Sequence, residues 1–278
     1  MIAVVCLQFL TTLEMNMDLG LRAQHVLVTG GSKGIGLACA QGFLAEGARV
    51  TLVGRNPQTL AQALETLGGD AQRVATVAAD LCDAQAALSA LDGAEAGFGP
   101  VDVLVNSAGA ARRTPPDELT PQAWHDAMQA KYFSYLHMID PAIKRMALRG
   151  RGVIVNVVGA GGKVASPIHL PGGAANAALM LVSAGLAAAY GPRGVRVNAV
   201  NPGATLTERL REGLNAEARL QGISPEEALE RSRAKLPLGR LATPDEIANA
   251  VVFLASPKAS YITGAILAMD GAVTPMVV

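Results

Sequence analysis

The sequence has few cysteines, few aromatic residues and no excess of charge. Only 3 of its 278 residues are cysteine (Cys6, Cys39 and Cys82), and their spacing suits neither a disulfide framework nor a metal-binding cluster. The net charge of zero removes the electrostatic attraction that nucleic acid or an anionic membrane would require. Aromatic residues make up 4% of the chain, so the core should consist mainly of Val, Leu, Ile and Ala. We therefore expect a cytoplasmic protein without metal, nucleic-acid or membrane partners.

Long apolar runs and linkers are also absent. No apolar run approaches the roughly 20 residues that a membrane-spanning helix needs. No proline- or serine-rich stretch divides the chain. Residues 1–13 are apolar but lack the basic start of a secretory signal. We interpret residues 1–20 as a loosely ordered extension or the product of an upstream start, and residues 21–278 as one domain.

Near its start the sequence does contain a strand, a glycine turn and a helix. The apolar residues 26–28 are followed by Thr-Gly-Gly-Ser-Lys-Gly-Ile-Gly at 29–36 and by helix-compatible residues at 37–44. Glycines at positions 30, 34 and 36 permit a sharp bend and let a pyrophosphate approach the backbone N–H groups at the helix N-terminus. The pattern indicates a dinucleotide site; the alternative is an ordinary glycine-rich turn.

The rest of the chain alternates between strands and helices. Further apolar stretches predict six more strands, at residues 49–53, 74–79, 101–105, 153–158, 195–200 and 266–269. Long helices are expected at residues 121–149 and 172–190. This alternation predicts a single doubly wound parallel sheet with helices on both faces. Residues 204–240 exceed what a crossover needs, and two amphipathic helices there would form a substrate lid.

The glycine turn and the strand ends resemble the short-chain dehydrogenase/reductase family. The family's TGxxxGxG pattern is matched at residues 29–36, its NNAG segment is approached at 106–109 and its RVNxVxPG segment at 196–203. The resemblance covers residues 21–271. It implies a Rossmann-type sheet, a bound dinucleotide, action on a carbonyl or alcohol substrate, and a homodimer or homotetramer. The predicted cofactor-binding residues are Gly30, Ser32, Lys33, Gly34, Ile35, Gly36, Arg55, Asp80, Leu81, Asn106, Ala108, Gly109, Asn176, Pro202, Gly203 and Thr207.

Some of these residues have specific expected roles. The resemblance implies that Asp80 and Leu81 contact the adenine and that Thr207 binds the nicotinamide carboxamide. Arg55 stands about 20 residues past the glycine turn, where folds that prefer NAD usually carry an acidic residue. An arginine there can pair with a 2′-phosphate, and Lys33 adds a second positive charge. We predict a preference for NADP(H) over NAD(H); the alternative is that Arg55 is only a solvated loop charge.

A further absence concerns catalysis. The resembled family carries an asparagine, a serine and a Tyr-x3-Lys pair, whose tyrosine exchanges a proton with the substrate as hydride moves. The matching positions in this chain hold Lys131, Gly159, Gly172 and Asn176. None of the 4 tyrosines has a lysine four residues later, so the pair is absent in every alignment register.

Two residues are candidates for the missing proton donor. Lys131 should lie on a helix face that borders the crevice, with Tyr135 one turn along on the same face. His169 precedes the helix at 172–190 and can titrate near neutral pH. For each, the alternative is a structural or solvated polar residue.

Three functions remain open at this stage. The first is an NADP(H)-dependent oxidoreductase with a non-standard proton route. The others are a catalytically silent NADP(H) sensor or scaffold, and a non-redox lyase or isomerase that reuses the crevice. The Leu and Ala content of residues 204–240 predicts an apolar small-molecule substrate.

Overall fold

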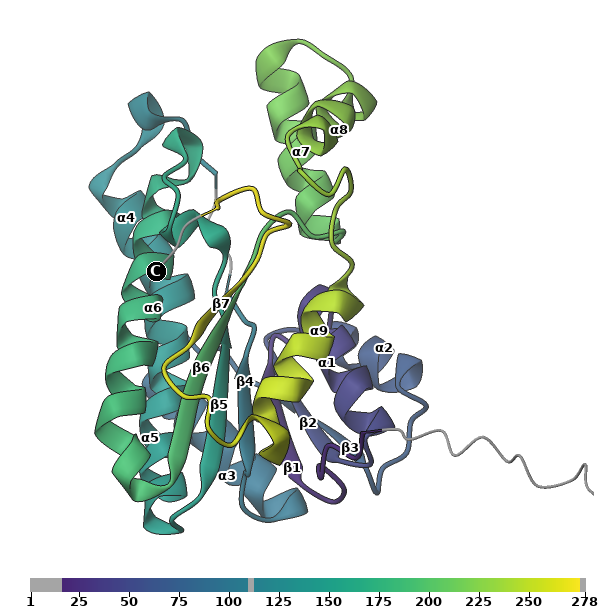
Figure 1. Cartoon of the computed structure of the whole chain (residues 1–278), viewed down its shortest axis with the longest axis vertical. Coiled ribbons are helices and arrows are strands. Elements are labelled where there is room, and N and C mark those ends of the chain that lie inside the picture. The colour runs from purple at the N-terminus through teal and green to yellow at the C-terminus, as the bar shows by residue number, and fades with distance from the viewer. Residues whose placement is uncertain (1–16, 110–112, 276–278) are drawn as a thin grey trace, which may run out of the picture.

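A seven-stranded parallel sheet forms the centre of the protein (Figure 1). The computed structural model describes residues 17–109 and 113–275, so most of the extension expected at residues 1–20 lies outside the described residues. The strand order is β3-β2-β1-β4-β5-β6-β7, which confirms the predicted doubly wound sheet. The strands are β1 (His25–Thr29), β2 (Arg49–Gly54), β3 (Val74–Ala78), β4 (Val103–Asn106), β5 (Gly152–Val157), β6 (Val195–Pro202) and β7 (Ile266–Met269).

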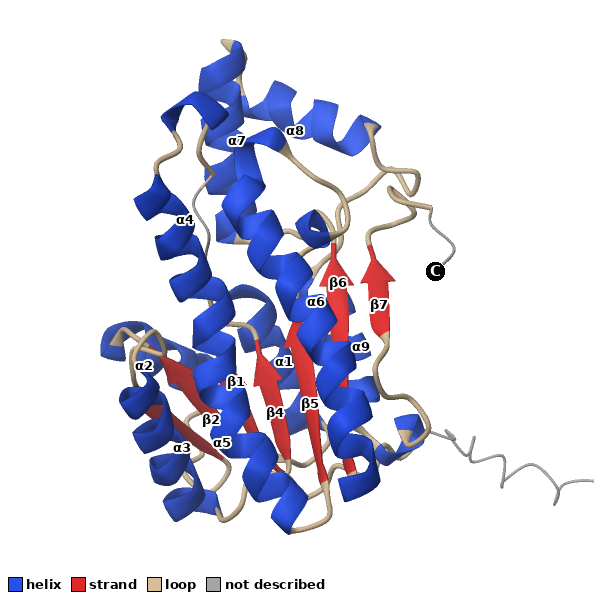
Figure 2. Cartoon of the chain, turned by 90° about the vertical axis from the view of Figure 1, so that its left-hand side faces the viewer, coloured by secondary structure: helices blue, strands red, loops and turns tan. Residues whose placement is uncertain are grey.

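Helices cover both faces of the sheet (Figures 1 and 2). One apolar core lies between the sheet and α1, α2 and α9, and a second lies between the sheet and α3, α5 and α6. The helices are α1 (Gly34–Ala45), α2 (Pro57–Thr66), α3 (Ala84–Phe98), α4 (Pro121–Ala127), α5 (Ser134–Leu148), α6 (Leu170–Tyr190), α7 (Glu208–Gln221), α8 (Pro225–Ala234) and α9 (Pro244–Ala255).

The direction of winding reverses between β1 and β4. Strand β1 pairs with β2 on one side and with β4 on the other, and Thr29 at the end of β1 lies opposite Asn106 at the end of β4. A parallel sheet binds ligands in the crevice outside its carboxyl ends at such a reversal point. The fold therefore places the glycine turn and the end of β4 side by side at this edge.

The long helix predicted at residues 121–149 is interrupted. Helix α4 ends at Ala127, a π-helical segment spans Met128–Phe133, and α5 begins at Ser134. A π turn holds one residue more than an α turn, and such segments are frequent at functional sites. Lys131 lies within this segment.

Helix α6 is more apolar than the sequence analysis allowed. The stretch Pro167–Arg193 contains an 18-residue window with a mean hydropathy of 1.5, so it is long and apolar enough to cross a membrane by length and composition only. This finding corrects the expectation that no apolar segment reaches that length. The helix contributes Leu179 and Ala187 to the core beside β6, so covering the sheet accounts for apolar residues on its inner face.

Helices α7 and α8 stand above the carboxyl ends of the strands (Figure 2). They form the two amphipathic helices expected within residues 204–240. Leu214 and Ala218 of α7 pack against Ala228 of α8 in a small core of their own. These apolar residues thus hold the two helices together, whereas Leu206 and Leu238 of the same segment are exposed.

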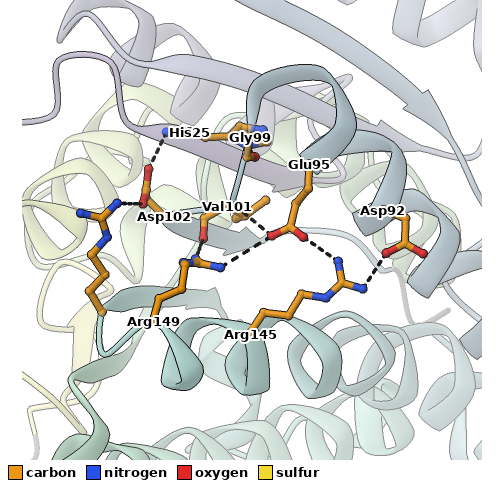
Figure 3. Close-up of polar contacts among 9 residues, drawn as sticks. His25, Asp92, Glu95, Gly99, Val101, Asp102, Arg145 and Arg149 are labelled. Atoms are coloured by element: carbon orange, nitrogen blue, oxygen red, sulfur yellow. Dashed lines mark hydrogen bonds and ion pairs between the residues drawn. The ribbon is translucent and has the colours of Figure 1, made fainter.

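An ion-pair network joins α3 to α5 at the opposite end of the sheet (Figure 3). The Arg145 guanidinium contacts the Asp92 and Glu95 carboxylates, each at 2.6 Å. Glu95 also accepts a hydrogen bond from the backbone N–H of Val101 at 3.1 Å, and Arg149 donates to the Val101 carbonyl. The network fixes both helices to the amino end of β4 and is remote from the crevice, so its role is structural.

Candidate functional site

Two glycines in the turn after β1 are packed too tightly to carry a side chain. Gly30 has a φ of +65°, and a Cβ built on it would lie 2.7 Å from the Cα of Ala108. A Cβ on Gly36 would collide with the carbonyl oxygen of Gly30. Helix α1 also has no side-chain N-cap, which leaves backbone N–H groups for an anionic ligand. This cradle suits the pyrophosphate of a dinucleotide.

Thr29 fixes the end of β4 against this turn. Its hydroxyl accepts hydrogen bonds from the N–H groups of Ser107 at 3.2 Å and Ala108 at 3.3 Å, and donates to the Asn106 side chain at 3.3 Å. The Asn106 amide in turn donates to Asn156 at 3.0 Å. Asn106 is fully buried, so its side chain braces the strand ends and leaves only its backbone for the predicted cofactor contact.

The start of α7 lies against the glycine turn. The Thr207 hydroxyl caps α7 by accepting from the N–H of Leu210 at 3.3 Å, and its methyl group lies 3.3 Å from a Cβ built on Gly34. The Lys33 ammonium forms an ion pair with Glu208 at 2.9 Å. Thr207, which is predicted to bind the carboxamide, and Lys33, which is predicted to bind the phosphate, therefore both lie where the glycine turn meets α7.

Arg55, Asp80 and Leu81 follow β2 and β3 at the neighbouring part of the edge. Burial raises the pKa of the Cys82 thiol, Asp80 adds to this, and Arg55 opposes it, so these charged groups lie close together. The Asp80 carboxylate accepts from the N–H of Cys82 at 3.1 Å. The Leu81 side chain is buried in the core, and its carbonyl bonds the His137 ring at 2.9 Å.

Other predicted positions are confined by their neighbours. The Ser32 hydroxyl lies 3.8 Å from a Cβ built on Gly54, and Ile35 packs on the core between the sheet and α1. A Cβ on Gly203, which follows Pro202 at the end of β6, would lie 2.9 Å from the Cα of Asp270. These contacts fix the positions of the glycine turn and of the segment that follows β6.

Lys131 and Tyr135 meet at the carboxyl end of β5. The Lys131 ammonium donates to the Tyr135 hydroxyl at 2.7 Å and to the Val157 carbonyl at 3.1 Å. The Tyr135 hydroxyl donates to the same carbonyl at 2.7 Å. Burial lowers the pKa of Lys131 to about 7, with a further contribution from Arg209. Burial raises the pKa of Tyr135, so its hydroxyl stays protonated while Lys131 titrates near neutral pH.

The side-chain oxygen of Asn176 lies in the same region without a hydrogen-bond partner among the described residues. The residue is only 5% exposed. A Cβ built on Gly159 would lie 3.2 Å from its side-chain nitrogen. A buried polar atom left unpaired costs about 1–3 kcal/mol. Asn176 therefore marks a place where a ligand would complete the hydrogen bonding.

His169 borders this amide and Gly172. A Cβ on Gly161 would be 3.3 Å from the Cδ2 of His169 and 3.9 Å from the Asn176 nitrogen. Burial lowers the pKa of His169, and Arg113, Arg209 and Lys131 lower it further, so the ring is neutral at pH 7. Gly172 is buried in the first turn of α6 and offers no side chain. The structure thus brings both candidate proton donors near each other at the carboxyl end of the sheet.

The sequence analysis did not identify Arg113 or Arg209. The signal for Arg209 is its place in the first turn of α7, where the helix dipole disfavours a cation. No comparable signal marks Arg113, which follows β4. Across residues 17–109 and 113–275, no group of three or more His, Cys, Asp or Glu side chains could hold a metal ion.

Comparison with known proteins identifies the family. Residues 30–274 match the family described as enoyl-(acyl carrier protein) reductase. The chain is 38% identical to D-threitol dehydrogenase of Mycolicibacterium smegmatis, over 94% of this chain and 97% of that protein. It is 32% identical to gluconate 5-dehydrogenase of Gluconobacter oxydans, over 91% and 96%. The structure of L-sorbose reductase from Gluconobacter frateurii, complexed with NADPH and L-sorbose, matches with a TM-score of 0.87, 29% identity and coverage of 94% and 100%. The parallel sheet changes its direction of winding beside the glycine turn, and the family match and the relatives agree with this fold. This protein belongs to the short-chain dehydrogenase/reductase family.

Proposed function

We propose that this protein is an NADP(H)-dependent oxidoreductase that interconverts a small-molecule alcohol and its carbonyl compound. The observation that carries the proposal is that the glycine turn, with no room for a Cβ at Gly30 or Gly36, and the unpartnered side-chain oxygen of Asn176 lie at the same edge of the sheet. The relatives named as threitol and gluconate dehydrogenases, and the sorbose reductase complexed with NADPH, support it.

The residues of the crevice fit this cofactor. The glycine turn would hold the pyrophosphate at the N-terminus of α1. Arg55 and Lys33 would bind the 2′-phosphate, Asn176 would bind ribose hydroxyls, and Thr207 would bind the carboxamide. When bound, the cofactor donates or accepts the hydride. The protein must then supply or remove one proton at the substrate oxygen.

Lys131 is the group best suited to hold that proton. Its pKa of about 7 means that both the ammonium and the amine are populated at neutral pH. Tyr135 and Val157 accept two of the three N–H bonds of the ammonium, and no described residue accepts the third. The neutral ring of His169 would orient the substrate oxygen. This route replaces the tyrosine that the family carries where this chain has Gly172.

The first test is cofactor binding followed by turnover. NADPH should raise the melting temperature of the purified protein, and a panel of ketoses, polyols and simple ketones should reveal substrate-dependent NADPH absorbance changes. Binding without turnover of any compound would favour the silent sensor, and absence of NADPH binding would refute the proposal.

The second test separates the two candidate proton donors. Lys131→Ala should reduce kcat by about 10²–10⁴-fold, the usual contribution of a positioned acid or base. His169→Ala should mainly raise KM. His125→Ala, which removes an exposed histidine of α4, is the matched control and should leave both constants unchanged. The opposite ranking of Lys131 and His169 would assign the proton to His169.

A further inference from the structure

The π turn that carries Lys131 departs from an α-helix at one backbone hydrogen bond. The N–H of Ser134 donates to the carbonyl of Gln129, five residues back, whereas in an α-helix it would donate to the carbonyl of Ala130. Turns of this kind are rare, so contacts outside the backbone ladder are expected to hold this one in place.

The Ser134 side chain bonds the carbonyl that its own N–H passes over. Its hydroxyl donates to the Ala130 carbonyl at 3.0 Å and lies 3.2 Å from the Lys131 carbonyl, so one proton is shared between the two acceptors. Ser134 is only 3% exposed, so water competes little for these bonds. A serine that bonds the carbonyl four residues back slightly weakens a regular helix and favours a bend. The hydroxyl therefore stabilises the turn from within.

This hydroxyl alone does not account for the π turn. Ser183 of α6 makes the same contact, to the Leu179 carbonyl at 2.7 Å, and it is also buried. Helix α6 nevertheless stays α-helical from Leu170 to Tyr190. The difference between the two serines must therefore lie in the contacts of the residues around the turn.

The loop after β3 braces the turn from outside. The Gln129 side-chain amide donates to the Cys82 carbonyl at 2.5 Å, and the Cys82 thiol donates to the Gln129 carbonyl at 3.7 Å. Beyond the turn, the His137 ring bonds the Leu81 carbonyl at 2.9 Å. The loop is thus attached near the start of the turn and again after its end. These bonds fix Gln129, whose carbonyl is the one that the displaced N–H reaches.

The turn also packs against Gly109, at the end of the segment after β4. A Cβ built on Gly109 would lie 2.5 Å from the Ala130 carbonyl oxygen and 3.2 Å from the Cα of Lys131. The backbone of Lys131 therefore has little room to shift on this side. From this position its ammonium reaches the Val157 carbonyl at 3.1 Å.

We propose that Ser134 and Gln129 are positioning residues that keep the π turn formed and thereby hold the Lys131 amine at the carboxyl end of β5. If the turn converted to an α-helix, Lys131 would change its angular position around the helix axis and its amine would leave the Val157 carbonyl. The consequence for turnover rests on the proposed function, in which Lys131 holds the proton. The position of the amine does not depend on that function.

The titration of Lys131 reports where its amine lies. Burial lowers its pKa to about 7, and a more exposed amine would regain hydration and titrate at higher pH. Among the described residues, the charged or titratable groups that interact with it are Tyr135 of α5, Arg209 of α7 and His169 just before α6. All three are retained in the variants that test the proposal, so a change in the midpoint reflects the position of the amine.

An NMR titration tests this position without turnover. The protein is labelled with ¹³C at the lysine Cε atoms, and the Lys131 signal is assigned by its loss in Lys131→Met. Ser134→Ala combined with Gln129→Met removes both side-chain donors, and we expect the Lys131 pKa to rise by about one unit or more. An unchanged or lower pKa would overturn the proposal. If the double variant does not fold, the single variants decide by the same criterion, each with a smaller rise.

Matched controls separate this effect from general destabilisation. Ser183→Ala removes the equivalent buried hydroxyl from α6, and Gln122→Met removes a glutamine amide of α4 that bonds Asp126 at 2.8 Å. Neither should move the Lys131 pKa, although Ser183→Ala should lower the melting temperature. A rise in Ser183→Ala equal to that in Ser134→Ala would attribute the effect to lost stability and would overturn the proposal.

Turnover provides a second arm, which also depends on the proposed function. For carbonyl reduction, kcat of the double variant should fall about tenfold or more, and the midpoint of the pH profile should rise with the NMR midpoint. A rise in the NMR midpoint without a change in the rate profile would remove Lys131 as proton donor and leave its positioning intact. If NADPH binding or turnover is absent, the proposed function fails, and the NMR titration still decides whether Ser134 and Gln129 hold the amine.

Discussion

Lys131 and Tyr135 stand four residues apart, and their polar ends meet on one acceptor, the Val157 carbonyl oxygen. The ammonium also lies 4.3 Å from the centre of the Tyr135 ring. This arrangement holds a partly buried amine at the end of β5, where none of the described carboxylates contacts it. The free-energy cost of protonating that amine, together with the hydrogen bonds that hold it, determines how substitutions of Lys131 and Tyr135 should affect the protein.

Replacing Lys131 by methionine should stabilise the fold and remove activity. Burial lowers the pKa of Lys131 from 10.5 to about 7, so the unfolded chain holds this proton more tightly than the folded protein does. Below pH 7 the folded protein bears the full cost of the charge, and the cost shrinks as pH rises from 7 toward 10.5. We expect Lys131→Met to raise the free energy of unfolding by about 1–3 kcal/mol at pH 6 and by less at pH 9. Urea denaturation at both pH values measures this, and a variant less stable than the parent at pH 6 would contradict it.

The rate of carbonyl reduction should fall as pH rises through about 7, because Lys131 must be protonated to donate. Alcohol oxidation should show the opposite trend, since it needs the neutral amine. The measurement is kcat/KM in both directions between pH 5.5 and 9, with NADPH affinity followed over the same range. The same midpoint in Lys131→Arg would assign the titration to another group.

Removing the Tyr135 hydroxyl should shift that pH profile. Tyr135→Phe deletes an acceptor of the Lys131 ammonium, which disfavours its charged form, so the midpoint should move to lower pH. The lost hydrogen bonds should destabilise the protein by about 1 kcal/mol. Tyr132→Phe is the control within the same π-helical segment and should not move the midpoint. A shift of equal size in both variants would argue against the role of Tyr135.

A single methyl group should disable the glycine turn. Gly36→Ala places a Cβ against the Gly30 carbonyl, so we expect at least a tenfold loss of NADPH affinity, measured by fluorescence titration. Gly97→Ala is the matched control, because a Cβ there meets nothing within 4 Å. In α3 that change should stabilise the protein by about 0.5–1 kcal/mol. Unaltered NADPH affinity in Gly36→Ala would mean that the turn does not bind the cofactor.

Cofactor preference should depend on Arg55. Reversing this exposed charge in Arg55→Asp should lower the kcat/KM ratio of NADPH to NADH at least tenfold, because a carboxylate repels the 2′-phosphate and accepts from a 2′-hydroxyl. The control Arg22→Asp reverses an exposed charge before β1. If the two variants show the same ratio, Arg55 is only a solvated loop charge.

The sheet was predictable because each strand is a short apolar run that ends in glycine or a polar residue. Strand β7 was placed at its observed bounds, Ile266–Met269. The π-helical segment was not predictable, since the residues on both sides of it are equally compatible with a continuous α-helix. Helix periodicity shows which residues share a face but not where one extra residue enters a turn.

The candidate site was predictable only where its contacts are local. The four-residue spacing of Lys131 and Tyr135 indicated their contact. Their shared bond to Val157 crosses 26 and 22 positions, and no sequence pattern reports it. The same limit applies to Asn106, because a motif cannot distinguish a side chain that lines a crevice from one that braces the sheet beneath it.

The extra residue in Met128–Phe133 has a consequence for how this protein could be re-engineered or diverge. Deleting one codon in that stretch would restore a continuous α-helix, because the π turn holds one residue too many. With about 100° of rotation per residue, the deletion would turn α4, and Trp124 with it, around the axis of α5. When the deleted residue lies between Lys131 and α5, the amine would leave the end of β5 while every strand kept its register, so loss of one amino acid would be enough to dismantle the proposed acid–base group and spare the scaffold.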